Sequence, residues 1–263
     1  MRVWALAGAA LLAGGAPAAD NELTAQEKAA GWKLLFDGKT YGGWEDPTKK
    51  SPPGDSFTIE DGCLKSTSHP KIEEDLFTQE TFADFELQFD WRISARGNSG
   101  VKYRIQDRIL LDPQLPWSVA QVNAAVTNRR TGRPAKGQEY VIGFEYQITD
   151  NATNPDALNG LLHRTAALYD MFAASKDVTR PVGEFNRSRL VVQGDHIEHW
   201  LNGEKVLDAS LKAPEVAQAV AKRWGRESPV YHLLVDQPRR SCQVSLQNHS
   251  DVAWFKNIRI KRL

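Results

Sequence analysis

Hydrophobic and polar residues alternate over much of the chain, most regularly across residues 85–93. The apolar positions of this run are Phe85, Leu87, Phe89, Trp91 and Ile93. A period of two is typical of a strand with one face on a core and the other in water. A second run, 101–106, follows the sequence Gly97-Asn98-Ser99-Gly100. Two strands separated by such turn residues predict a hairpin of an antiparallel sheet.

Shorter alternating runs recur along the chain with turn sequences between them. Asp61-Gly62 interrupts residues 57–65, and Asn202-Gly203 follows residues 196–201. Dipeptides of this type favour tight hairpin turns. Apolar residues at helical spacing occur from Pro214 to Trp224, which predicts one short helix. The whole pattern predicts an all-β fold, a two-sheet antiparallel β-sandwich of about ten to thirteen strands.

Two segments lack the alternation and are predicted to be long loops. They span Asp107 to Gln138 and Asn151 to Arg164. Long loops inside a compact domain often form the lid or the wall of a binding site.

The first residues have a composition of their own. Arg2 precedes an apolar stretch from Val3 to Ala13, and Ala16-Pro17-Ala18 offers small residues for cleavage. This order is typical of a secretory signal peptide, and the stretch is shorter than the roughly 20 residues that span a bilayer. We therefore predict a signal peptide at 1–18 and a single domain at 19–263. The protein is expected to be exported, periplasmic or secreted, with no membrane span.

The 263-residue chain has 33 basic and 33 acidic residues and no block of like charge. Nucleic acid and anionic membranes are not expected as partners, because both select a basic surface. Eight Trp and ten Phe supply a core and leave rings for stacking on a flat ligand. Cys63 and Cys242 either form a disulfide or are separate buried thiols, and neither lies in a zinc-binding pair.

Polar residues at alternate positions form three rows that we expect on strand faces turned away from the core, since residues i and i+2 of a strand share a face. Each row alone also fits an ordinary solvated sheet face. Together the three predict a polar cleft. The rows are Lys102, Arg104 and Gln106; Glu145, Gln147 and Thr149, followed by Asp150; and Gln243, Ser245, Gln247 and His249.

Two further groups contain ionisable residues. His163-Arg164 ends the second predicted loop and Tyr169-Asp170 follows it. Such loop-borne groups are more often functional than the same residues on a regular surface. Tyr169 is equally compatible with the core. His199 shares a strand face with Ile197 and Leu201, so we expect a buried, hydrogen-bonded histidine.

The sequence Glu145-Tyr146-Gln147-Ile148-Thr149-Asp150 can be compared with jelly-roll glucanases. Those enzymes carry Glu-x-Asp-x-x-Glu, whose outer carboxylates act as nucleophile and acid/base. Here Gln replaces the middle Asp, and the last carboxylate is one methylene shorter. Retaining hydrolysis needs two carboxylates about 5 Å apart, and the shorter carboxylate and the lost middle charge argue against that chemistry. A glucanase that uses Glu145 and Asp150 is kept as the third hypothesis.

An ordered set of motifs resembles the 3-keto-disaccharide hydrolase family, formerly a domain of unknown function, over nearly the whole mature chain. The chain departs from the family pattern at Thr165-Ala166-Ala167, where Thr-Gly-Ala is more usual, in the long segment Asp107 to Gln138, and from Cys242 to Gln247. The matching motifs are Leu35 to Lys39 with Trp44, Glu60 to Gly62, Phe82 to Leu87, Gly97 to Val101, Tyr103 with Arg104, Glu145 to Asp150, Ala167 to Asp170, His199 to Gly203, Leu246 to His249, and Phe255 to Ile260.

The resemblance implies a concanavalin-like jelly-roll fold and an exported bacterial enzyme that acts on 3-keto-glycosides. A ketone at C3 of a sugar acidifies the proton on C2. Removal of that proton gives an enolate that can expel the group on C1, and water then adds back. His249 suits the base at neutral pH, and Arg104 or a bound divalent cation would stabilise the enolate.

The catalytic candidates are therefore His249, Glu145 and Asp150, which are also the expected ligands of such a cation. The substrate-binding candidates are Arg104, Gln147, Tyr169, Asp170, Gln247 and Asn98. A carbohydrate is the expected partner. Beside the 3-keto-glycoside enzyme and the glucanase, the sequence leaves open a non-catalytic carbohydrate-binding module.

Overall fold

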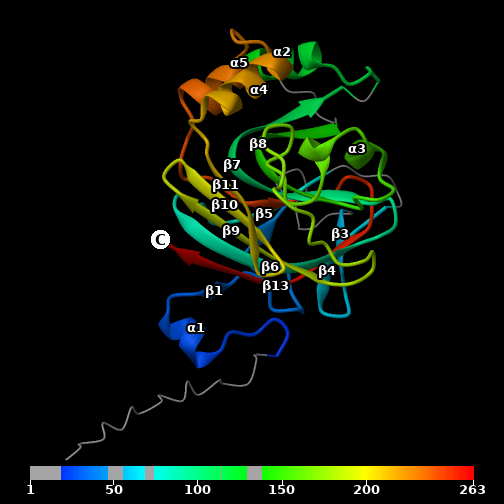
Figure 1. Cartoon of the computed structure of the whole chain (residues 1–263), viewed down its shortest axis with the longest axis vertical. Coiled ribbons are helices and arrows are strands. Elements are labelled where there is room, and N and C mark those ends of the chain that lie inside the picture. The colour runs from blue at the N-terminus through cyan, green and yellow to red at the C-terminus, as the bar shows by residue number, and fades with distance from the viewer. Residues whose placement is uncertain (1–18, 47–55, 69–73, 113, 129–137) are drawn as a thin grey trace, which may run out of the picture.

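The computed structural model describes residues 19–46, 56–68, 74–112, 114–128 and 138–263 (Figure 1). The signal peptide predicted at 1–18 lies outside the described residues. The strands are β1 Lys33–Leu34, β2 Trp44–Glu45, β3 Phe57–Glu60, β4 Cys63–Ser66, β5 Leu76–Thr78, β6 Phe85–Ile93, β7 Asn98–Leu111, β8 Gln138–Thr149, β9 Asn186–Gln193, β10 His196–Leu201, β11 Glu204–Ser210, β12 Ser245–Leu246 and β13 Ala253–Arg262. The helices are α1 Ala25–Ala29, α2 Val119–Thr127, α3 Pro155–Leu158, the 3-10 helix η2 Leu161–His163, α4 Pro214–Trp224, α5 Pro229–Tyr231 and the π-helix η3 His232–Asp236.

These strands form two antiparallel sheets that pack face to face, which confirms the predicted β-sandwich (Figure 1). The larger sheet, sheet A, has eight strands in the described residues, in the order β11-β10-β9-β6-β13-β4-β3 with β1 also paired to β13. The smaller sheet, sheet B, has five, in the order β2-β5-β12-β7-β8.

The hydrophobic core lies between the inner faces of the two sheets. All five apolar positions of the alternating run in β6 are buried. Phe89 of β6 meets Tyr146 of β8 edge-on, with ring centroids 5.8 Å apart. Because burial of a Phe-sized side chain stabilises by about 1.5–3 kcal/mol, this shared core holds the sheets together.

The two longest alternating runs do not form the predicted hairpin. β6 pairs with β9 and β13 in sheet A, whereas β7 pairs with β8 and β12 in sheet B. The chain crosses from one sheet to the other at residues 94–97. A Cβ on Gly97 would lie 2.6 Å from Cγ1 of Ile93, so this bend has room only for glycine. Alternation identified both strands, but it does not specify their partners.

Helix α4 coincides with the predicted helix and buries Val216, Val220 and Trp224. The expectation of one helix was too low, because α2 lies inside a segment predicted as a loop, and α1, α3 and α5 are also present. Helices α2, α4 and α5 gather at one end of the sandwich (Figure 1). Among the described residues, no helix has the length and apolar character needed to cross a membrane.

A bulge interrupts the pairing of β7 with β8. Tyr103 lies opposite Phe144, but the next pair, Asp107 with Ile142, is four residues on along β7 and only two along β8. Arg104 adopts a left-handed φ of 51° in this bulge. A bulge of this kind re-aims the side chains that follow it, so the alternation of β7 does not continue through residue 104.

The two cysteines are separate buried thiols, one of the two possibilities that the sequence left open. Sγ of Cys63, in β4, donates to the carbonyl of Asp61 at 3.7 Å. Sγ of Cys242 donates to the carbonyl of Arg239 at 3.2 Å.

His199 of β10 is buried between the sheets, as the sequence predicted. Its Nδ1 lies 2.9 Å from the carbonyl oxygen of Ala166, and its Nε2 lies 3.0 Å from the hydroxyl of Tyr103. Because a carbonyl only accepts, Nδ1 carries the proton and Nε2 accepts from Tyr103. Burial lowers the pKa of His199 to about 4, against the opposing effect of the Ala166 hydrogen bond. The ring is therefore neutral at pH 7.

We predict that His199 makes the fold sensitive to mild acid. Between pH 6.5 and 4 the unfolded chain takes up the proton more readily than the native protein, so native stability is complete above pH 6.5 and falls as the pH drops. The loss corresponds to about 3 kcal/mol at pH 4. In urea unfolding, the stability advantage of wild type over His199→Gln should shrink by about this amount from pH 7 to 4.

His196→Gln is the matched control, because His196 is exposed on the other face of the same strand. The buried His199 is intact in this variant, so the loss of stability between pH 7 and 4 should persist. If the difference between wild type and His199→Gln is constant from pH 7 to 4, the buried imidazole is not the acid-sensitive group.

Candidate functional site

A cavity of about 630 Å³ opens on the outer face of sheet B. Its floor consists of residues of β7 and β8, most of which alternate with core residues, and of the residues that directly follow β12. Its walls come from α4, α5, η3 and the segment that follows β8. The volume lies within the range of small-molecule binding sites.

Four polar side chains contact one another on the floor. The Lys102 ammonium, from β7, lies 3.1 Å from Oδ2 of Asp75. Gln247, with its amide oriented to suit both neighbours, accepts from Lys102 Nζ at 3.2 Å and donates to Glu145 Oε1 at 3.3 Å. Lys102 and Glu145 are directly opposite in the β7–β8 ladder. The floor thus holds one ammonium between two carboxyl groups.

Gly100 makes room for the side chain of Glu145. It lies two residues before Lys102 on the same face of β7, opposite Gln147. A Cβ at Gly100 would lie 2.4 Å from Oε1 of Glu145 and 2.9 Å from its Cδ. The backbone of Gly100 is outside the left-handed region, so glycine is needed here for space and not for its φ angle.

The floor changes the protonation of its own groups. Burial raises the pKa of Glu145 to about 7, with the nearby Asp75 adding to the shift and Lys102 and Arg223 opposing it. Burial by itself lowers the pKa of Lys102, but Asp75 and Glu145 outweigh it and raise that pKa above its ordinary value. Near neutrality Glu145 is therefore divided between acid and carboxylate, while Lys102 remains an ammonium. A half-ionised Glu145 suits proton transfer, and a charged Lys102 suits stabilisation of an anion.

The segment after β8 adds a second charged group. Tyr169 stacks on His163, with ring centroids 4.9 Å apart. The His163 imidazole lies 3.0 Å from Asp156 Oδ1 and 3.3 Å from Asp170 Oδ1. Asp170 also pairs with Nη1 of Arg223, from the last turn of α4, at 3.1 Å. These contacts fasten the segment to the helix across the cavity.

One wall of the cavity is aromatic. The rings of Trp117, Tyr140 and Trp224 contact one another with centroids 5.9 to 6.3 Å apart. The Arg223 guanidinium lies 6.0 Å from the ring centroid of Trp117 and 5.1 Å from that of Trp224.

Of the nine candidate residues predicted from the sequence, seven line this cavity: Asn98, Glu145, Gln147, Tyr169, Asp170, Gln247 and His249. The strand register brings most of them together, because Gly100 lies opposite Gln147 and accepts a backbone hydrogen bond from Gln247 at 2.9 Å. Oδ1 of Asn98 is buried without a hydrogen-bond partner in the described part of the chain. The catalytic and binding roles of these residues stay predictions.

Arg104 lies outside the cavity, which corrects the prediction that it belongs to one polar cleft with the other rows. The bulge turns its side chain away from the face that carries Lys102. Its guanidinium donates to the carbonyls of Gly194, at 2.6 Å, and Arg240, and pairs with Asp84 at 3.4 Å. Arg104 therefore joins loops at the edge of the sandwich.

Asp150 also lies outside the cavity. Its carboxylate accepts from the N–H groups of Arg96 at 2.9 Å and Ala152 at 3.0 Å, and from the hydroxyl of Thr153. Burial would raise the pKa of Asp150, but these hydrogen bonds lower it below its ordinary value. The carboxylate fixes the turn after β8. It does not converge with Glu145 and His249, so neither the predicted cation ligands nor the glucanase pair is assembled.

Several cavity residues were not singled out from the sequence. Lys102 belonged to a predicted row, and its position opposite Glu145 became visible only with the strand register. Asp75, Glu139 and Arg223 carried no sequence signal of their own. Burial, together with the charge of Asp75, raises the pKa of Glu139 above its ordinary value despite Arg108.

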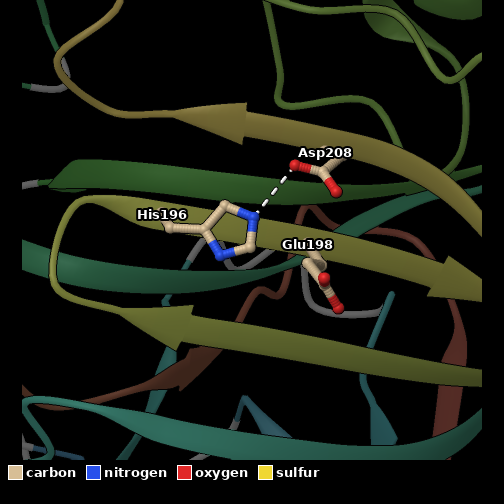
Figure 2. Close-up of side chains that lie close together, drawn as sticks. All are labelled: His196, Glu198 and Asp208. Carbon is tan, nitrogen blue, oxygen red and sulfur yellow. Dashed lines mark hydrogen bonds and ion pairs between the residues drawn. The ribbon is translucent and has the colours of Figure 1, made fainter.

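In the described residues, one group has the composition and proximity of a metal site: His196, Glu198 and Asp208, with ligand atoms within 4.8 Å of one another. In Figure 2 the dashed line marks the interaction of His196 with Asp208, and none is drawn to Glu198. The distance from His196 Nε2 to Asp208 Oδ1 is 2.9 Å. The Lys205 ammonium already contacts both carboxylates, Glu198 at 3.2 Å. The group lies on the outer face of sheet A, on the opposite side of the sandwich from the cavity.

Comparisons with known proteins, by sequence and by structure, find similar proteins that cover most of this chain. A 3-keto-disaccharide hydrolase of Bacteroides thetaiotaomicron is 31% identical over 249 residues, which cover 89% of this chain and 79% of the relative. A solved structure from Parabacteroides distasonis, described as a candidate glycosyl hydrolase, is 26% identical with a TM-score of 0.70, over 93% of this chain and 100% of that one. A second from the same organism has a TM-score of 0.58 at 22% identity, over 88% and 99% of the two chains, and shows the same fold.

Residues 31–261 match the family model described as the 3-keto-alpha-glucoside-1,2-lyase-like domain. This range contains the motifs of the sequence analysis and the whole cavity floor. The chain therefore belongs to the 3-keto-alpha-glucoside-1,2-lyase-like family.

Proposed function

We propose that the protein is an exported enzyme that cleaves 3-keto-glycosides by removing the C2 proton and expelling the group on C1. The observation that carries the proposal is the buried Glu145 carboxyl, with a pKa of about 7, linked through Gln247 to the Lys102 ammonium on a cavity floor. The names of the family and of the curated relative support the substrate class. Export rests on the sequence pattern of residues 1–18.

Glu145 is the group best placed to take the C2 proton. A general base works best when its pKa is near the working pH. As the C2–H bond breaks, its electron pair moves into the C2–C3 bond and negative charge develops on the C3 oxygen. The C1–O bond then breaks, and the leaving oxygen takes a proton. His249, an exposed residue of the cavity lining, is a candidate donor.

Lys102 is the group best placed to stabilise the enolate. Its raised pKa keeps it charged, and a fixed cation beside a developing anion lowers the barrier because it needs no reorganisation. A covalent imine with the ketone would require the neutral amine, which the same shift disfavours. We therefore assign Lys102 an electrostatic role.

Addition of water to C1 would complete the reaction. The elimination product has a C1–C2 double bond conjugated to the C3 ketone, and water adds at C1 while C2 regains a proton. The net result is hydrolysis. This sequence accounts for both the lyase in the family description and the hydrolase in the name of the relative.

A carbohydrate-binding module would not need these groups. Burial of charged side chains costs several kcal/mol unless each is paired, and a lectin requires only stacking rings and hydrogen-bonding groups. The titrating carboxyl beside a buried ammonium favours the enzyme over the binding module.

Deuterium incorporation tests the mechanism. In D₂O, cleavage of methyl 3-keto-α-glucoside should give 3-ketoglucose with deuterium at C2, because the abstracted proton exchanges with solvent. The unoxidised methyl α-glucoside should not react, and a chelator should leave the rate unchanged if Lys102 supplies the positive charge. NMR measures the label, and the product incubated alone corrects for spontaneous exchange. Cleavage of the unoxidised glycoside, or product without the label, would point to direct hydrolysis.

Substitution of Glu145 and His249 separates their roles. Glu145→Gln should lower kcat/KM by about 10²–10⁴-fold and abolish C2 exchange. In the wild type, kcat/KM should rise with pH and level off above about pH 7, because the base acts only when deprotonated. His249→Ala should slow cleavage but retain C2 exchange. Glu198→Gln, on the outer face of sheet A, serves as the control and should keep the wild-type rate. Exchange that survives in Glu145→Gln but not in His249→Ala would reverse the two assignments.

Gly100→Ala should displace the Glu145 carboxyl and lower kcat/KM by about tenfold to a hundredfold, since misplacement by about 1 Å has effects of this size. The three atoms nearest to a Cβ at Gly100 all belong to Glu145. In a Glu145→Ala background, Gly100→Ala should therefore cost little further stability. Rates and urea unfolding of the four proteins test this. Equal destabilisation by Gly100→Ala in both backgrounds would show that the backbone, and not Glu145, requires glycine.

A further inference from the structure

Trp117 takes no part in the proposed reaction, yet it is held at the cavity in an exposed state. It lines the cavity, and 49% of its surface is open to solvent. Tyr140 and Trp224 contact its ring with centroid distances of 6.2 and 6.3 Å. A large ring kept exposed and held by its neighbours is typical of a recognition surface.

The cavity has two chemically different ends, with Arg223 between them. On one side Arg223 pairs with Asp170 and lies 5.6 Å from the ring of Tyr169. On the other side it lies over Trp117 and Trp224. The reactive pair, Lys102 and Glu145, belongs to the polar floor. The aromatic end is therefore a separate subsite within the same cavity.

The aromatic end offers ring faces and few free polar groups. Val220, Val230 and Leu234 also line the cavity. Arg223 is already paired with Asp170, and its Nη2 donates to the Tyr140 hydroxyl at 3.4 Å. A second sugar ring placed here would have hydroxyls with few partners, and unpaired polar groups weaken binding. A flat apolar ring has no such requirement.

We infer that this aromatic end binds the leaving group of the substrate and selects an aryl aglycone over a second sugar. The assignment of its occupant as the leaving group rests on the proposed function. The preference for an aryl ring rests on Trp117 and its neighbours alone. Stacking on Trp117 is expected to strengthen binding of an aryl glycoside by about five- to tenfold.

Calorimetric titration of the full chain with phenyl α-D-glucoside, methyl α-D-glucoside and maltose tests the subsite. Wild type should bind the phenyl glycoside about tenfold more tightly than the other two. Trp117→Ala should weaken phenyl glucoside about fivefold and leave methyl glucoside within about twofold. Leu115→Ala is the control, because Leu115 is similarly exposed at 57% but does not line the cavity. It should bind all three ligands like wild type.

Three results would each overturn the inference. The first is no measurable binding of phenyl glucoside by wild type, and the second is equal weakening of phenyl and methyl glucoside binding by Trp117→Ala. The third is maltose binding as tight as that of phenyl glucoside, with the same dependence on Trp117. These ligands have no C3 ketone, so binding is measured without turnover. Trp117-dependent binding of the phenyl glycoside in a protein that cleaves no 3-keto-glycoside would reject the proposed function and retain the subsite.

Discussion

The arrangement of the outer face of sheet B depends on one buried charge, the ammonium of Lys102. An ammonium taken from water costs several kcal/mol unless it is paired and hydrogen-bonded. The partners come from separate strands and strand ends: Asp75 before β5, Gln247 after β12 and, through Gln247, Glu145 on β8. Only the strand order β5-β12-β7-β8 brings them to one place. The register that pairs this buried charge is thus also the one that assembles the candidate site.

Much of this floor could be predicted from the sequence. Alternation placed Glu145 and Gln147 on one face, and Gln247 and His249 on another row of the same surface. The alternation gave a wrong position for Arg104, because the hydrophobic pattern does not reveal a bulge. Gly143 accommodates the bulge, but in the sequence it resembles any other strand glycine. A Cβ there would lie 3.1 Å from the carbonyl of Tyr103. Alternation did not place Asp150 on this face: motif comparison suggested it, and it lies just beyond the last residue of β8.

The walls of the cavity were less predictable than its floor. Arg223 and Trp224 lie in a helix that periodicity identified, but periodicity does not reveal which part of the sheet a helix covers. Trp117 lies in a segment predicted as a loop, where a lone aromatic residue has no pattern to interpret. Position 166, where the family more usually has glycine, has a φ of 66°. Ala166 occupies this left-handed position at a cost of about 1–2 kcal/mol, and its carbonyl accepts from the buried His199.

The position of β13 has a consequence for how the chain reaches this structure. Residues 253–262 form an interior strand of sheet A, between β6 and β4, and β1 also pairs with them. The pairing of β6 with β13 joins residues 160 or more positions apart, such as Ala253 with Ile93. Contacts of such sequence separation slow folding, because the loop must close before they are gained. Until residue 262 has been synthesised, β6 and β4 lack the strand that joins them in sheet A. Sheet A therefore cannot be completed between β6 and β4 until the last strand of the chain is present.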